Sequence, residues 1–217
     1  MTMSNGKSII VDTSRCTGCR GCQVACKQWN GLPASPTTQT GTYQNPPDFN
    51  GCTYKVVRFA DGRGADGKPY WYFTSDMCRH CVEPPCLAGS SVEGGMIHDE
   101  ATGAVVYTAK SKDDDFETAQ SVCPYNVPRK NEETGAMVKC TMCIDRISNG
   151  MVPACVQACP TGAMVFGDRD EILAEVQRRV NELKKTHPKA QAVDADSVRV
   201  IFIVTDDPDR YHTHLKA

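Results

Sequence analysis

The sequence has no excess of basic residues. Its 217 residues include 24 Lys and Arg against 26 Asp and Glu, which gives a formal net charge of −2 at pH 7. Proteins that bind nucleic acid or anionic membrane surfaces show a basic excess, because they must neutralise phosphate groups. We therefore expect no nucleic-acid partner.

Long hydrophobic runs are also missing. The longest stretch without a charged residue, 147–167, is long enough to span a bilayer but contains Pro153, Pro160 and three glycines. Such a segment does not form a lipid-facing helix, so we expect no membrane span. The first 16 residues contain only the short apolar run 9–11 before Asp12, and we expect no signal peptide.

Sequence patterns of catalysis are absent as well. No Ser/His/Asp or paired-carboxylate pattern stands out, and no P-loop is present. We therefore expect no catalytic residues and no turnover by this chain alone.

Cysteine, by contrast, is abundant, with 13 residues. Disulfides, zinc sites or iron–sulfur clusters can explain such a content. An odd number cannot be fully paired within one chain, and disulfide-dense domains are usually shorter than about 80 residues. A metal centre is therefore favoured.

The cysteines fall into regularly spaced groups. They are Cys16, Cys19, Cys22 and Cys26; Cys78, Cys81 and Cys86; Cys123 alone; and Cys140, Cys143, Cys155 and Cys159. A structural zinc usually takes two thiolates from each of two distant segments. Three thiols separated by two residues each can instead hold three corners of a cubane, and a fourth thiol three residues later ligates another cluster. The spacing predicts iron–sulfur clusters, with zinc as the alternative.

Pairing each group of three with a distant fourth thiol predicts three [4Fe–4S] clusters. Cluster 1 takes Cys16, Cys19, Cys22 and Cys159; cluster 2 takes Cys26, Cys140, Cys143 and Cys155; cluster 3 takes Cys78, Cys81, Cys86 and Cys123. Cys52 is left over and is expected to be a small buried apolar side chain. His80 either tunes a cluster through a hydrogen bond or faces solvent, and Trp29 and Trp71 are expected to pack around the clusters.

The predicted secondary structure is short and broken. Composition predicts strands at 7–12, 54–59, 70–74 and 105–108, and loops at 31–50 and 60–68. Apolar residues at helical spacing predict a helix over 170–186, which Pro188 ends, followed by a strand at 198–204.

The cysteine motifs resemble those of a known family. Residues 16–30, 78–86, 123–129, 139–146 and 153–163 are similar to the iron–sulfur electron-transfer subunits of the dimethyl sulfoxide reductase superfamily. The segments Ala-Cys-Lys-Gln-Trp-Asn (25–30) and Gln-Asn-Pro-Pro-Asp (44–48) most resemble the small subunit of soluble formate dehydrogenases whose large subunit holds tungsten or molybdenum.

This resemblance implies an α+β fold with two pseudo-symmetric ferredoxin-like halves and a C-terminal helix–strand tail. Residues 1–50 with 125–167 are expected to form the half that carries two clusters. Residues 51–124 would form a degenerate half with one cluster, and 168–217 a docking or packing segment.

The resemblance also implies a role in an oxidoreductase complex. A large partner subunit would oxidise formate at its metal–pterin cofactor, and this non-catalytic subunit would pass the electrons through three [4Fe–4S] clusters to an acceptor such as a c-type cytochrome. Export with the partner would place it in the periplasm, with the cytoplasm as the alternative. The rival interpretations are the iron–sulfur subunit of a polysulfide, nitrate or dimethyl sulfoxide reductase, and a free-standing polyferredoxin.

Overall fold

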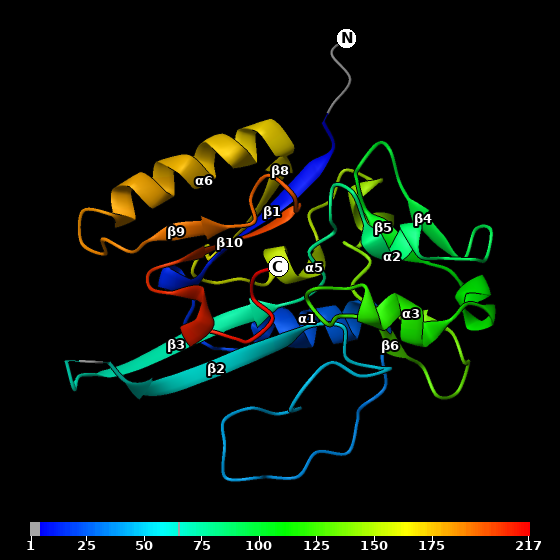
Figure 1. The fold of residues 1–217 in the computed structure, drawn as a ribbon, viewed down its shortest axis with the longest axis horizontal. Helices are drawn as coiled ribbons and strands as arrows, with labels where there is room; N and C mark the ends of the chain where they lie inside the picture. The colour runs from blue at the N-terminus through cyan, green and yellow to red at the C-terminus, as the bar shows by residue number, and fades with distance from the viewer. Residues whose placement is uncertain (1–4, 65) are drawn as a thin grey trace.

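The computed structural model describes residues 5–64 and 66–217 and shows a mixed α/β protein. Its largest sheet has four strands in the order β8 (Met164–Asp168), β1 (Lys7–Asp12), β10 (Val200–Val204) and β9 (Gln191–Val193). β1 pairs in parallel with β10 and antiparallel with β8. The beginning and the end of the chain therefore share one sheet (Figure 1).

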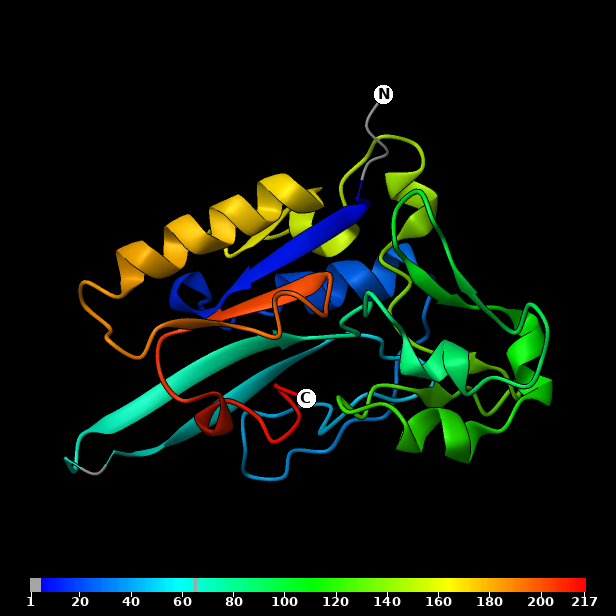
Figure 2. The ribbon, with the colours of Figure 1, turned by 45° about the horizontal axis from the view of Figure 1, so that its top comes forward.

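The composition of the two inner strands explains their position. The apolar residues 9–11 of β1 and all five residues of β10 are at most 1% exposed. Strands that are apolar on both faces must be covered on both sides. Helix α6 (Arg169–Leu183) lies over one side of the sheet and buries Ile172, Val176 and Val180, while the β2–β3 hairpin lies on the other side (Figure 2).

The hairpin consists of β2 (Val56–Arg63) and β3 (Pro69–Asp76). The predicted loop at 60–68 is wrong in its first part, because β2 continues through Arg63 and pairs Ala60 with Tyr72. Gly and Asp disfavour strands locally. The aromatic side chains of β3 nevertheless stack along the ladder, with the ring centres of Tyr70 and Tyr72 5.2 Å apart, and tertiary pairing overrides the local preference.

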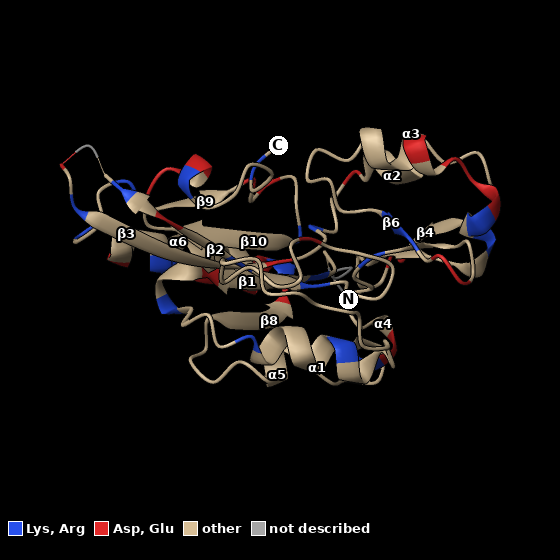
Figure 3. Ribbon diagram, turned by 90° about the horizontal axis from the view of Figure 1, so that it is seen from below, with Lys and Arg blue, Asp and Glu red and all other residues tan. Residues whose placement is uncertain are grey.

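Three helices that carry or flank the outer cysteine groups lie together on the β8 side of the main sheet (Figure 3). They are α1 (Gly21–Trp29), α4 (Ile144–Ile147) and α5 (Ala154–Gln157). The indole N–H of Trp29 donates to Asp145 at 2.8 Å, and the Arg146 guanidinium lies 4.2 Å from the Trp29 ring centre. These contacts fix α4 against the end of α1.

The middle of the sequence forms a separate group of short elements. These are α2 (Pro85–Ala88), β4 (Met96–His98), β5 (Val105–Tyr107), α3 (Phe116–Ser121), β6 (Arg129–Lys130) and β7 (Met137–Val138). They enclose a second apolar cluster that includes Met96, Ala119 and Met137. Three 3₁₀ turns complete the described elements, η1 (Thr13–Arg15), η2 (Ala109–Asp113) and η3 (Pro208–Arg210).

Residues 168–217 are integral to the core rather than a peripheral arm. The segment contributes α6, β9 and the inner strand β10. The segment therefore packs against the rest of the protein. A docking role for it stays a prediction. None of the helices in the described ranges has the length and apolarity needed to cross a bilayer.

Candidate iron–sulfur sites

Four thiols from opposite ends of the sequence line one hollow beside the main sheet. Cys16, Cys19, Cys22 and Cys159 surround a space of about 370 Å³, part of it open to solvent, together with apolar side chains such as Val11 and Met164. The Ser75 hydroxyl lies 3.0 Å from the Cys22 sulfur. The structure thus brings Cys159 to the first cysteine group, where the crossed assignment expects it.

The loop that carries the first three thiols requires particular backbone conformations. Gly18 has φ +67°, and a Cβ at this position would approach the rings of Phe59 and Phe73 to 3.1 Å. Arg20 also has a positive φ and immediately precedes α1. Glycine at position 18 lets the loop turn tightly against the hairpin, because it alone adopts this conformation without strain.

Helix geometry explains why Cys22 and Cys26 belong to different sites. They are four residues apart on α1, so they share a face but are displaced along the helix axis by one turn. Cys155, on α5, and Cys159 have the same spacing. Cys22 and Cys159 line the first hollow, while Cys26 and Cys155 are buried in the interior.

The second set lies deeper than the first. Cys26, Cys140, Cys143 and Cys155 are 5–8% exposed. Cys155 and Cys143 are the thiols whose repulsion contributes most to the raised pKa of Cys26, after burial, and Cys26 and Cys155 do the same for Cys140. These effects place the four thiols within electrostatic reach of one another, as they also place Cys22 near Cys26 and Cys78 near Cys140.

The third set also lines a hollow, within the middle group of elements. Cys78, Cys81, Cys86 and Cys123 surround a space of about 350 Å³, part of it open to solvent, together with Tyr107, Tyr125, Val127, Lys139 and several prolines. Cys123 comes from the turn after α3, far from Cys86 in sequence. The lone cysteine of the sequence therefore completes a set of four.

Two of the cysteine loops adopt the same local geometry. In Cys78–Cys81 and Cys140–Cys143 the third residue, His80 or Met142, has a positive φ of 46° or 57°. In both loops the backbone N–H of this residue donates to the sulfur of the first cysteine at 3.4 Å. Backbone hydrogen bonds to sulfur are one means by which proteins stabilise and tune iron–sulfur clusters.

Burial disfavours the charged form of most of these thiols. It raises the pKa of Cys26 and Cys81 from 9.0 to about 12, and that of Cys155 to about 11. Cys159 is an exception. Burial raises its pKa too, but hydrogen bonds from Met164, Thr161 and Ala163 outweigh this effect and lower the pKa below 9.0. Iron ligands are thiolates, so the buried sets need a positively charged group to offset their repulsion.

The residues fit iron–sulfur clusters. Each hollow offers four thiols and apolar walls, which is the donor set of a [4Fe–4S] cluster. In the part of the sequence that the structure describes, no three His, Cys, Asp or Glu side chains converge closely enough to hold a single metal ion. The thiols of the first and third sets instead surround shared hollows, as the ligands of a polynuclear cluster do.

A buried ion-pair network supports the loop between β3 and Cys78. Asp76 accepts from Arg58 Nε at 2.9 Å and from Arg79 at 2.8 Å, and all three side chains are at most 8% exposed. The Arg79 guanidinium also lies 4.2 Å from the Phe202 ring centre on β10. Neither this network nor Ser75 was anticipated from the sequence, since isolated polar residues within strands carry no motif.

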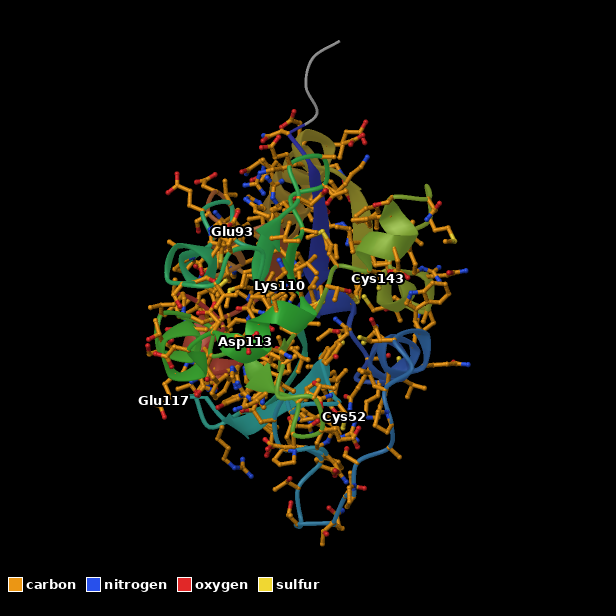
Figure 4. The ribbon with its side chains drawn as sticks, turned by 90° about the vertical axis from the view of Figure 1, so that its right-hand side faces the viewer. Cys52, Glu93, Lys110, Asp113, Glu117 and Cys143 are labelled. Atoms are coloured by element: carbon orange, nitrogen blue, oxygen red, sulfur yellow. The ribbon has the colours of Figure 1, made fainter. Side chains whose placement is uncertain are left out.

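The structure decides between the alternatives for His80 and differs from expectation at other residues beside the ligands. His80 is fully buried and its Nδ1 accepts the Val105 N–H at 3.0 Å, so it does not face solvent. Trp29 and Trp71 are 44% and 52% exposed, which makes the predicted packing around clusters partial at best. Cys52 is half-buried, not buried, with the Lys27 ammonium 3.7 Å from its sulfur, and it lies well apart from Cys143 (Figure 4).

Known proteins share this combination of motifs. Residues 69–169 match the family described as "4Fe-4S dicluster domain". The chain is 53% identical over 214 residues to the formate dehydrogenase subunit beta of Megalodesulfovibrio gigas, covering 97% of this chain and 99% of that protein. It is 46% identical over 213 residues to the formate dehydrogenase 2 subunit beta (cytochrome c-553) of Nitratidesulfovibrio vulgaris Hildenborough, covering 96% and 97%.

A more distant similarity reaches the wider superfamily. The B subunit of the anaerobic dimethyl sulfoxide reductase of Escherichia coli K12 is 30% identical over 180 residues, which cover 78% of this chain and 77% of that protein. The fold, the thiol sets and these similarities define an iron–sulfur electron-transfer protein. More particularly, this protein belongs to the family of formate dehydrogenase beta, or iron–sulfur, subunits.

Proposed function

We propose that this chain carries three [4Fe–4S] clusters, ligated by twelve of its thirteen cysteines. Cluster 1 takes Cys16, Cys19, Cys22 and Cys159; cluster 2 takes Cys26, Cys140, Cys143 and Cys155; cluster 3 takes Cys78, Cys81, Cys86 and Cys123. The observation that carries the proposal is the clustering of these thiols in three sets of four. Bound clusters supply one-electron transfer, and the thiolates hold them in place.

The three sets form a series from one surface to another. Cys19 of the first set is exposed, and Cys81 and Cys123 of the third are half-buried, while all four thiols of the second are buried. Cys22 raises the pKa of Cys26, which makes the first and second sets neighbours, and Cys78 raises that of Cys140, which makes the second and third neighbours. Electrons that enter at one end of this series leave at the other.

The two-half architecture is part of the same proposal. The matched pairs Cys22/Cys26 and Cys155/Cys159, which lie on or beside the contacting helices α1 and α5, support a ferredoxin-like half formed by 1–50 and 125–167. Within these bounds, β6 and β7 pack with the middle group of elements. The third hollow supports a degenerate half with one cluster in 51–124. Residues 168–217 would pack both halves together and contribute to docking.

The reaction served by the chain is formate oxidation. We infer a large partner subunit with a molybdenum- or tungsten-pterin site, from which this chain carries electrons to a c-type cytochrome in the periplasm. Two relatives are named as formate dehydrogenase beta subunits, and the name of one includes cytochrome c-553. The thiols of the described residues suit this role, since thiolate-bound clusters transfer single electrons.

Purification of the native complex tests this proposal. The chain should co-purify with a larger subunit that holds the pterin cofactor, and the complex should reduce a c-type cytochrome with formate. The isolated chain, reconstituted with iron and sulfide, should not oxidise formate with a dye acceptor. If the complex reduces polysulfide, nitrate or dimethyl sulfoxide and does not oxidise formate, the proposed substrate is wrong. If the chain is found without a partner, it is a free polyferredoxin.

A further inference from the structure

Two lysines are buried without a carboxylate partner. Lys55 is 1% exposed and Lys139 is 4% exposed. In the described ranges 5–64 and 66–217, neither ammonium lies within 4.0 Å of a carboxylate. Burying an ammonium without an opposite charge is strongly unfavourable. A negative group beside each ammonium would offset this cost in the working protein.

Lys55 contacts residues beside the first set of thiols and lies within electrostatic reach of the second. Its Nζ contacts the Met77 sulfur at 3.0 Å and the Ser75 carbonyl oxygen at 3.5 Å, and the Ser75 hydroxyl contacts the Cys22 sulfur. Burial by itself lowers the pKa of Lys55. In their thiolate forms, Cys155, Cys22, Cys140 and Cys26 attract the ammonium, more than offset burial and raise the pKa of Lys55 above 10.5.

Lys139 occupies the corresponding place between the second and third sets. It directly precedes Cys140 and lines the hollow of Cys78, Cys86 and Cys123. Its ammonium donates to the carbonyl oxygens of Val105 and Cys140 and lies 4.6 Å from the Tyr107 ring centre. All of these neighbours are uncharged.

Three other buried cations of the protein are paired with carboxylates. Arg58 and Arg79 share Asp76, and Arg179 pairs with Asp12 at 3.1 Å. Arg146, Arg169 and Arg199 are also buried, have no carboxylate within 4.0 Å among the described residues, and donate to uncharged oxygens. Lys55 and Lys139 lie beside the thiol sets. The negative charge that the lysines face is that of the thiolates themselves.

We propose that Lys55 and Lys139 are fixed counter-charges between successive clusters, Lys55 raising the reduction potentials of clusters 1 and 2, and Lys139 those of clusters 2 and 3. This inference rests on the proposed cluster assignment. Reduction adds one negative charge to a cluster, so a nearby cation favours the reduced state. Cluster 2 is the most buried and has both lysines beside it. Burial alone would lower its reduction potential and hinder electron transfer through it, and the two lysines offset this effect.

Redox titration of the intact complex, followed by electron paramagnetic resonance, tests the inference. Lys55→Met should shift the potentials of clusters 1 and 2 to more negative values and leave cluster 3 nearly unchanged. Lys139→Met should shift clusters 2 and 3 and spare cluster 1. The control is Lys110→Met, which removes an exposed lysine of η2 (Figure 4) and should shift none. Equal shifts of all three clusters, or no shift, would overturn the inference.

If a methionine variant loses iron, its potentials cannot be compared, and a variant that keeps the positive charge then tests the inference. Lys55→Arg should then keep the iron content and potentials near those of the unchanged protein, because it preserves the cation. If the arginine and methionine variants both lose iron, the side chain acts through its shape and the inference is wrong. Iron content and the number of signals in the unchanged protein test the cluster assignment separately, so the two failures can be told apart.

Discussion

The backbone N–H of Arg199 donates to the carbonyl oxygen of Arg79 at 3.0 Å. A second bond joins the Val82 N–H to the Ser197 carbonyl oxygen at 2.9 Å, and Cys81 forms an isolated β-bridge with Val198. These contacts tie the approach to β10 to the loop that carries Cys78 and Cys81. The C-terminal segment contains no cysteine, yet it supports the third site directly.

Deleting residues 194–217 should therefore destroy more than a docking surface. The deletion removes the inner strand β10 and its bonds to the Cys78–Cys81 loop, so we expect loss of cluster 3, about 4 iron atoms per chain by the four-iron rule, and general loss of structure. Iron analysis and circular dichroism measure both effects. A control variant that lacks only the last residue should keep its iron. Retention of three clusters by the deletion variant would show that β10 is dispensable.

Replacing the buried carboxylate of Asp76 should strongly destabilise the protein. Asp76→Asn leaves Arg58 and Arg79 buried with an uncharged partner, and breaking a buried ion pair typically costs about 3–5 kcal/mol. The measurement is the temperature at which the visible cluster absorbance is lost. The matched control is Asp66→Asn, because the exposed pair of Asp66 with Lys68 contributes only about 0–1 kcal/mol. Equal effects of both variants would contradict the proposed network.

Cluster assembly should be coupled to proton release. Since burial raises the pKa of Cys26, Cys81 and Cys155 to about 11–12, the cluster-free protein holds these thiols protonated at neutral pH. Iron binds thiolates, so its apparent affinity should rise with pH between 7 and 9, and reconstitution in weak buffer should acidify the solution. An affinity that does not depend on pH would contradict this.

The same shifts fix the sign of the pH dependence of the cluster-free protein. The raised pKa values favour the neutral thiols in the folded state, so their contribution to stability is present below pH 9 and is lost as the pH rises toward 11–12. Urea unfolding of the cluster-free protein at pH 8 and pH 10 would show this, with the lower stability at pH 10.

Some elements could be predicted because their sequences are locally consistent. The strand at 7–12 agrees with β1, and the helix at 170–186 agrees with α6 apart from its last turn, since β-branched runs and helical periodicity act over short distances. The continuation of β2 beyond Ala60 could not be predicted, because it depends on partners across the hairpin.

The thiol sets could be predicted from the sequence, whereas the residues that surround them could not. Cysteine spacing follows from the shape of a cubane, so the sets Cys16/19/22/159 and Cys78/81/86/123 could be proposed from sequence, and the structure brings their members together. Ser75, Asp76 and Lys55 have no such spacing. Tertiary packing alone brings them beside the thiols.

Cross-ligation gives a directional test of the sites. Cys159→Ala should damage the cluster held by Cys16, Cys19 and Cys22, whereas Cys26→Ala should damage the one held by Cys140, Cys143 and Cys155. Each variant should lose about 4 iron atoms and one spectroscopic signal. Cys52→Ala is the control and should keep all three clusters. Loss of the same signal in the Cys159 and Cys26 variants would refute the crossed arrangement.

Iron and sulfide analysis of the intact protein, with spin quantitation of the reduced form, tests the central claim most directly. The account predicts about 12 iron and about 12 sulfide per chain, in three [4Fe–4S] clusters. A content near 16 iron would require a fourth cluster in the middle half of the sequence. A content near 8 would mean that Cys123 does not complete the third set, and either result would contradict the proposed relay.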